Sequence, residues 1–233
     1  MMHVRLCSSV VLAGLSIASV SAQSGRLGHV ATLFAADGAS EDTFGESVAL
    51  GPDYVVIGAK EGGAGFESGS AYVYRLAGAQ WTLESELVPS DGDHYDDFAT
   101  AVDADGERLV VGAWRHDTQG LPQAGQVYLF ARCSSAWTEV ARLAHPDPMI
   151  DDLLGRAVAI DGTTLAASAP GAVGCFPGAG QVLVFVADES GTPEDPCDDT
   201  WNLQATLVSS ACSSIDTFGD DLDLDGERLV VGQ

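Results

Sequence analysis

The densest group of side chains that could do chemistry lies in the stretch SDGDHYDDF at residues 90–98. Its four carboxylates, Asp91, Asp93, Asp96 and Asp97, could supply oxygen ligands to Ca2+, which takes about six to eight oxygens. Aspartates at turns also cap backbone N–H groups, so a purely structural role is the alternative. The sequence therefore predicts a calcium site at these four residues, with turn capping as the competing interpretation.

Two further stretches resemble calcium-binding loops in sequence, DADGE at 103–107 and DLDGE at 223–227. Each lies between two apolar runs and is too short to wrap an ion with enough oxygens. The alternation of the flanking residues indicates that Asp103 and Asp223 point away from their apolar neighbours, into solvent.

No recognised catalytic signature appears, whether nucleophile elbow, zinc-protease, phosphate-loop or dinucleotide-binding motif. The histidines beyond residue 22 fall at unrelated places in the chain, so they predict no ring of metal ligands. The pair Asp96-Asp97 could serve a hydrolase, but an acidic turn has the same composition. We therefore expect a protein that is not an enzyme.

Composition limits the partners. The chain has 233 residues, 34 acidic and 10 basic side chains, and a net charge of −24. Such a chain repels nucleic acid and anionic lipid, and we expect neither as a partner.

Residues 1–22 predict a signal peptide: a weakly basic start, a short apolar run and the small residues Val20-Ser21-Ala22 before Gln23. The apolar run is too short to span a bilayer by itself, although a retained anchor is the alternative. We expect no membrane span in the mature chain and a secreted, cell-surface or periplasmic location.

An eighteen-residue segment occurs four times and must position these side chains. Its anchors are Phe44, Phe98, Leu154 and Phe218. After each anchor come an alternating strand, a tight turn, a second strand such as RLVVGA, a third strand opened by glycine, and a fourth opened by Trp81, Trp137 or Trp201. Asp-Gly marks three of the turns, because both residues tolerate positive φ.

Four-stranded units of this length predict an all-β chain folded as a β-propeller, with a β-sandwich as the alternative. We expect three full blades at 42–89, 96–145 and 152–209 and a partial blade at 216–233. Residues 27–38 match the fourth strand of a blade. The propeller region, 23–233, is therefore expected to begin with a fourth strand rather than with the first strand of a blade. The ring is incomplete, and either a longer protein or association of copies would complete it.

The landmarks Phe-Gly, VVIGA or VVGA, and GSAYVY or GQVYLF resemble the FG-GAP repeat family. That family includes the seven-bladed head of integrin α subunits and many exported bacterial proteins. The resemblance implies an exported propeller that binds an extracellular protein or glycan, as in cell adhesion. The alternative is the propeller portion of a larger exported enzyme such as a hydrolase. The variable loops 59–69, 113–124, 170–179 and 187–200 are the expected binding surface.

Four cysteines follow residue 22, an even number in a chain expected to be exported, which predicts two disulfides. Cys133 and Cys197 fall in hairpins between third and fourth strands, at one end of the blades. Cys175 and Cys212 fall in loops at the other end. The topology predicts the pairs Cys133–Cys197 and Cys175–Cys212.

Overall fold

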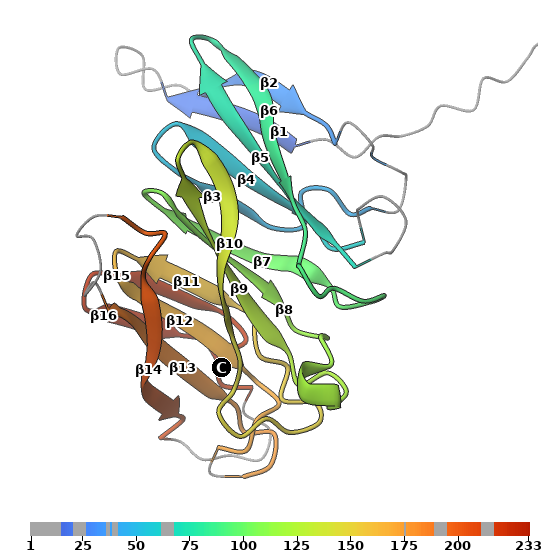
Figure 1. Cartoon of the computed structure of the whole chain (residues 1–233), viewed down its shortest axis with the longest axis vertical. Coiled ribbons are helices and arrows are strands. Elements are labelled where there is room, and N and C mark those ends of the chain that lie inside the picture. Colours follow the sequence, from blue (N-terminus) through green and yellow to red (C-terminus); the bar gives the residue numbers. More distant parts are fainter. Residues whose placement is uncertain are drawn as a thin grey trace, which may run out of the picture.

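A computed structural model of the chain describes residues 15–20, 27–35, 38, 42–61, 68–174, 176–188, 195–210 and 217–233. The pair Cys175–Cys212 lies outside these residues, so that prediction stays open. Three antiparallel four-stranded sheets follow one another along the chain, each in sequence order (Figure 1). The architecture is all-β and that of a propeller, as predicted, and the row of sheets is not closed into a ring.

The three complete sheets have closely matched strands. The first contains β3 (Val48–Leu50), β4 (Tyr54–Ala59), β5 (Ser70–Ala77) and β6 (Gln80–Leu87). The second contains β7 (Phe98–Asp105), β8 (Arg108–Ala113), β9 (Gln126–Cys133) and β10 (Ala136–Leu143). The third contains β11 (Val158–Asp161), β12 (Thr164–Ala169), β13 (Gln181–Asp188) and β14 (Thr200–Val208).

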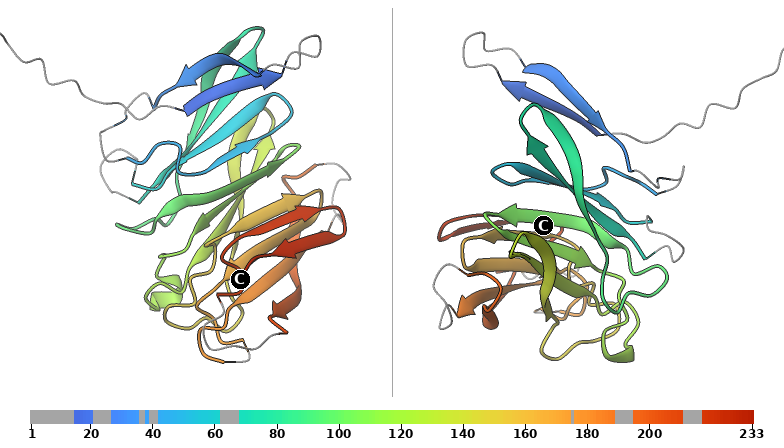
Figure 2. Two further views of the ribbon diagram at one scale, coloured as in Figure 1. Left: turned by 180° about the vertical axis from the view of Figure 1, so that it is seen from behind. Right: turned by 45° about the horizontal axis from the view of Figure 1, so that its top comes forward.

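Two shorter sheets lie at opposite ends of the row (Figure 2). One pairs β1 (Leu15–Val20) with β2 (Leu27–Leu33), and the other pairs β15 (Leu222–Asp225) with β16 (Arg228–Val231). The expected fourth strand at 27–38 therefore pairs with β1 and packs beside the first sheet. Among the described residues β16 has β15 as its sole strand partner.

The turns between first and second strands differ in detail from the prediction. Asp105, Asp161 and Asp225 are the last residues of their strands, and each pairs across the hairpin with the first residue of the next strand. Only the glycines that follow have positive φ, 57° at Gly106 and Gly162 and 61° at Gly226. The Asp-Gly pairs do mark the three hairpins, but the two-residue loop is Gly-Glu or Gly-Thr rather than Asp-Gly, so only the glycine of each pair uses positive φ.

The aspartates of these hairpins connect neighbouring sheets. Asp103 Oδ2 accepts the backbone N–H of Ile160 at 2.8 Å, and Asp105 Oδ2 accepts that of Gly162 at 2.8 Å. One sheet further, Asp161 Oδ2 accepts the N–H of Gly226 at 2.6 Å. The prediction of a solvated Asp103 was wrong, because the side chain faces the next sheet. Burial raises the pKa of this carboxyl, although two backbone N–H groups oppose the rise.

Glycine permits the closest contacts between sheets. A Cβ on Gly112, at the end of β8, would lie 2.0 Å from the carbonyl oxygen of Gly155 in the next unit. A Cβ on Gly58 would lie 2.1 Å from the carbonyl oxygen of Ala99. At the opening of the third strands, Gly125 has φ of 81° and would clash with Leu154. The repeated glycines are therefore required where one backbone presses on the next.

The hydrophobic cores lie between sheets rather than within them. One combines Val56 and Val73 of the first sheet with Phe98, Tyr128 and Trp137 of the second unit. The next joins the second and third sheets, and another joins the third sheet to β15–β16. At the first sheet the pattern changes: Val48 and Leu50 form the apolar side of the alternating strand expected after Phe44, yet they are 51% and 72% exposed. On that face Leu33 of β2 packs with β4 and β5, whereas Val48 and Leu50 of β3 stay uncovered.

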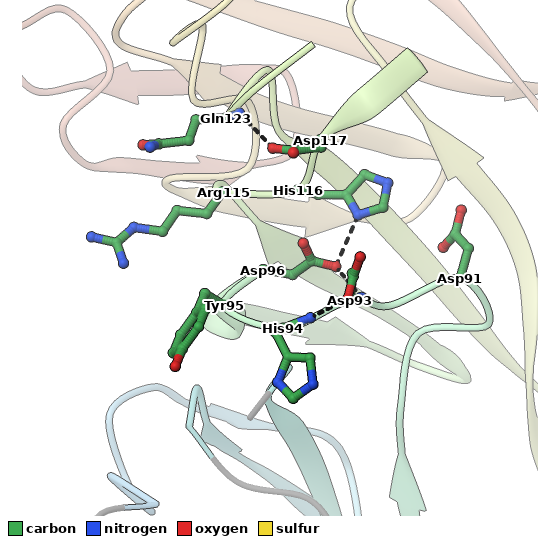
Figure 3. Close-up of a pocket in the computed structure, with 9 residues that line it drawn as sticks. All are labelled: Asp91, Asp93, His94, Tyr95, Asp96, Arg115, His116, Asp117 and Gln123. Carbon is green, nitrogen blue, oxygen red and sulfur yellow. Dashed lines mark hydrogen bonds and ion pairs between the residues drawn. The ribbon is translucent and has the colours of Figure 1, made fainter. Parts of the chain in front are cut away.

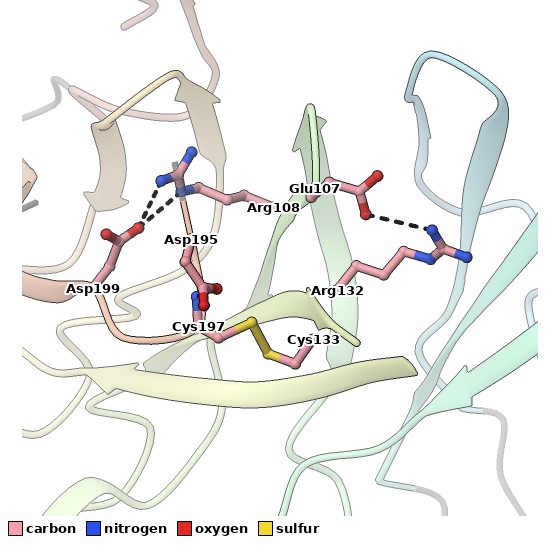
Figure 4. The surroundings of a disulfide bond; sticks show 7 residues. All are labelled: Glu107, Arg108, Arg132, Cys133, Asp195, Cys197 and Asp199. Carbon is pink, nitrogen blue, oxygen red and sulfur yellow. Dashed lines mark hydrogen bonds and ion pairs between the residues drawn. A yellow bond between two sulfur atoms is a disulfide. The ribbon is translucent and has the colours of Figure 1, made fainter. Parts of the chain in front are cut away.

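A disulfide joins Cys133, at the end of β9, to Cys197 before β14, with the Cα atoms 5.8 Å apart (Figure 4). It is the pairing predicted for these two hairpins. Beside it, Arg108 Nη2 contacts Asp199 Oδ2 at 2.6 Å, and the Asp199 side chain is only 3% exposed. Two links therefore fix the segment before β14 to the second sheet. Within the described part of the chain, no helix is long and apolar enough to cross a membrane.

Replacing Gly112 with alanine tests the close contact between sheets. We expect Gly112→Ala to lower the free energy of unfolding by about 1–3 kcal/mol, since backbone atoms must move. Gly232 occupies the same place in the last repeat, and its nearest prospective neighbour is 3.4 Å away. Gly232→Ala is the matched control and should leave the stability nearly unchanged in denaturant titrations at low protein concentration. Equal losses in both variants would contradict the account.

Candidate functional site

A polar pocket of about 380 Å3 lies where two connections meet at one end of the first and second sheets. One connection, residues 88–97, joins β6 to β7, and the other, residues 114–125, joins β8 to β9. The side chains that line it are Asp91, Asp93, His94, Tyr95, Asp96, Arg115, His116, Asp117 and Gln123 (Figure 3).

His116 and Asp96 form the buried floor of the pocket. His116 Nδ1 lies 3.0 Å from Asp96 Oδ2, and the two side chains are 12% and 5% exposed. Burial of the imidazole lowers the pKa of His116, but the hydrogen bond and negative charge of Asp96 outweigh burial and leave that pKa raised. The pair is a charge-assisted contact between the two loops.

Asp96 is also a turn cap that the repeat reproduces. Its Oδ2 accepts the backbone N–H of Asp93 at 2.7 Å. In the next unit, Asp152 Oδ2 accepts the N–H of Met149, also at 2.7 Å. Both aspartates stand two residues before an anchor and are buried. Turn capping, the competing interpretation of these aspartates, is therefore observed at this repeat position.

Asp91 is held by the second sheet. Tyr128 Oη donates to Asp91 Oδ1 at 2.9 Å, and Arg142 pairs with Asp91 Oδ2. Burial, followed by the hydrogen bond to Asp91, raises the pKa of the Tyr128 hydroxyl, which therefore stays a donor at all ordinary pH.

Asp97 points to a different partner from Asp96. Its Oδ2 lies 3.4 Å from Nε of Arg115, whose guanidinium lies 4.5 Å from the centre of the Trp114 ring. Burial raises the pKa of Asp97, with Arg115 opposing the rise. The ion pair and the cation–π contact together place the arginine at the pocket edge.

The four aspartates predicted to bind calcium therefore lie close in sequence but are directed to separate partners. Among the described residues, no group of three or more His, Cys, Asp or Glu side chains is arranged to hold a metal ion. Calcium binding stays a prediction of the sequence, and Asp91, Asp93, Asp96 and Asp97 remain its candidates.

The loops around the pocket are held in uncommon backbone conformations. Non-glycine residues with positive φ include Tyr95 (68°), Asp97 (54°), Gln119 (57°) and Gln123 (52°). Such residues cost free energy and concentrate at binding sites. Hydrogen bonds preserve the geometry: Asp117 Oδ1 accepts the N–H of Gln123 at 3.0 Å.

Sequence reasoning missed several residues of this pocket, namely Tyr95, Arg115, His116, Asp117 and Gln123. His116 is one of the histidines whose scattered places in the chain predicted no ring of metal ligands. A signal was present, because His116 lies three residues after β8 ends, in one of the loops expected to bind a ligand. Of those loops, the described residues 195–200 of 187–200 lie at the other end of the blades, where Cys197 is bonded to Cys133, away from this pocket.

Comparison with known families agrees with the repeat. The sequence model of the FG-GAP repeat matches residues 27–74, 81–130 and 137–185. The chain belongs to the FG-GAP repeat family. Each match runs from the fourth strand of one sheet through the third strand of the next, so the FG-GAP unit spans a junction between sheets. The FG and GA elements of the repeat are the segments that touch there, as Gly112 and Gly155 do.

Other comparisons with the FG-GAP chain are more distant. No curated protein matches it. Among solved structures, a periplasmic gluconolactonase of Pseudomonas aeruginosa is similar at 16% sequence identity and a TM-score of 0.47. The match covers 95% of this chain and 72% of the other.

The raised pKa of His116 makes a prediction about pH. A histidine with a raised pKa in the folded state adds stability that is full below its unfolded pKa of about 6.5 and is lost as pH rises through the folded value. The difference in melting temperature between the wild type and His116→Gln should therefore be largest near pH 5 and shrink toward pH 9. His94→Gln is the control. A difference that grows with pH would contradict the Asp96–His116 contact.

Proposed function

We propose that this FG-GAP chain is a non-catalytic binding module, located outside the cytoplasm, whose pocket between the first and second sheets takes a glycan. The observation that carries the proposal is the pocket itself: two loops from neighbouring sheets, fixed by hydrogen bonds, surround a space lined by polar side chains. The disulfide between Cys133 and Cys197 supports an oxidising compartment.

The chemistry of the lining favours a sugar. Tyr95 is 63% exposed and offers an aromatic face for stacking against a pyranose ring. Asp93 and Asp117 provide carboxylate acceptors for sugar hydroxyls, and Arg115 and Gln123 provide donors. The scarcity of apolar lining disfavours a hydrophobic peptide anchor.

A glycan array followed by calorimetry with the best ligand tests this proposal. Tyr95→Ala should weaken binding by about 2- to 10-fold through lost stacking. Asp93→Asn should weaken it by about tenfold or more through a lost charge-assisted hydrogen bond.

Phe176→Ala is the control, because Phe176 is an exposed aromatic residue, 49% exposed, in the β12–β13 loop, the third sheet's counterpart of the β8–β9 loop. It should leave affinity unchanged. Absence of any bound glycan, or equal loss in Phe176→Ala, would refute the glycan site. A catalytic domain in the same reading frame would instead favour the propeller portion of a larger enzyme.

A further inference from the structure

A second polar pocket, of about 380 Å3, lies where the first strands of four consecutive units meet. Its lining comes from the beginnings of β3, β7, β11 and β15 and the residues just before them, namely 47–48, 100–103, 156–159 and 220–223. Neighbouring first strands contact one another along the row, so four units contribute side chains to one space. None of the described residues that line it also lines the pocket proposed to take a glycan, so the two pockets are separate sites.

The repeat places opposite charges at equivalent points of this second pocket. The position two residues after the anchor is Arg156 in the third unit and Asp220 in the next, and both residues line the pocket. Asp221 follows directly and adds a second carboxylate to the lining. The pocket therefore has a guanidinium just before β11 and two carboxylates just before β15.

The charge of Arg156 is not neutralised by an ion pair. Within the described part of the chain, every other lysine and arginine side chain pairs with a carboxylate, and Arg156 does not. The chain has 34 acidic side chains and only 10 basic ones, so carboxylates are plentiful. Arg156 is exposed, and its N–H donors can therefore reach a ligand in the pocket.

The Trp114 ring holds the Arg156 guanidinium in place. The central carbon of that guanidinium lies 5.8 Å from the centre of the ring, and the corresponding carbon of Arg115 lies 4.5 Å from it. Attraction between a cation and an aromatic face positions the guanidinium without cancelling its charge. Arg156 is therefore positioned in advance, which lowers the entropy cost of binding an anionic group.

The two carboxylates are available as well. Within the described residues, the Asp220 side chain forms neither a hydrogen bond nor an ion pair, and Asp221 Oδ1 accepts only the backbone N–H of Leu222, at 3.0 Å. Both aspartates are exposed. Arg156 and Asp220 thus line one pocket without forming an ion pair, so a ligand has room between the opposite charges.

We propose that this pocket binds a small zwitterion, a free amino acid or a short peptide, with its carboxylate on Arg156 and its ammonium on Asp220 and Asp221. A planar guanidinium can bind a carboxylate through two parallel hydrogen bonds. A simple anion would be repelled by the two aspartates, and a simple cation by the arginine. A molecule that carries both charges satisfies all three side chains, and the pocket is within the range of small-molecule sites, about 300–1,000 Å3.

Calorimetry with alanine, dialanine and trialanine tests the proposal. The three compounds differ in the separation of their end charges, so the tightest binder reports the length that the pocket accepts, and we expect at least one to bind. The N-acetylated form of that compound lacks the ammonium, and its C-amidated form lacks the carboxylate. Each capped form should bind at least about tenfold more weakly, because a charge-assisted hydrogen bond is lost.

Substitutions assign each end charge of the ligand to its partner. Arg156→Gln should weaken binding of the zwitterion by at least about tenfold and remove the preference for it over the C-amidated form. Asp220→Asn combined with Asp221→Asn should likewise remove the preference over the N-acetylated form. Arg228→Gln is the control, because Arg228 is exposed, lies outside the pocket and pairs with Asp225. It should leave the affinity unchanged.

The capped compounds are tested on the wild-type chain, so the result does not depend on how the variants fold. Three outcomes would overturn the proposal: no binding of any of the three compounds up to about 10 mM, capped forms that bind as tightly as the zwitterion, or an unchanged affinity in Arg156→Gln. The two pockets share no lining residue, so failure here leaves the glycan proposal to its own test.

Discussion

The close approach of one sheet's backbone to the next is the constraint on which the rest of the structure depends. Gly112 faces the Gly155 carbonyl with no room for a methyl group, and Gly58 faces Ala99 in the same way. Around these contacts the aspartates of one hairpin accept N–H groups of the next, and apolar residues of adjacent sheets form shared cores. A single sheet cannot bury its own apolar faces, so the junction rather than the sheet is the stabilising unit.

The pocket is a product of the same constraint. The β6–β7 connection belongs to a junction, because it leaves the outer strand of one sheet and enters the inner strand of the next. The β8–β9 connection emerges beside it, and the contact of His116 with Asp96 ties the two loops together. The fixed spacing of the sheets allows both loops to hold strained residues, such as Tyr95 in the first and Gln123 in the second. Rigid strands with uncommon loop conformations suit recognition of a ligand.

Much of the fold was predictable because the repeat is explicit: anchors, glycine-opened strands and tryptophans recur at matched offsets, and the structure has a first strand after each anchor and third and fourth strands where the glycines and tryptophans predict them. The side of the sheet that Asp103 faces was predicted, but not that another sheet would cover it, since alternation does not reveal which face is stacked. The candidate site was predicted only in part. Asp91, Asp93 and Asp96 line the pocket. His116 contacts Asp96 from a loop 20 residues further along the chain, and no local sequence pattern predicts that contact.

Hydrogen exchange of the amides that cross between sheets is the most direct test that junctions hold the molecule together. The N–H groups of Ile160, Gly162 and Gly226 are bound by aspartates of the preceding sheet, and that of Leu154 is bound by the carbonyl of Ala124. The account predicts that these four amides are protected to the same degree as amides inside β8 and β12, because they open together. Exchange of the four at the rates of exposed loops, while β8 and β12 stay protected, would contradict it.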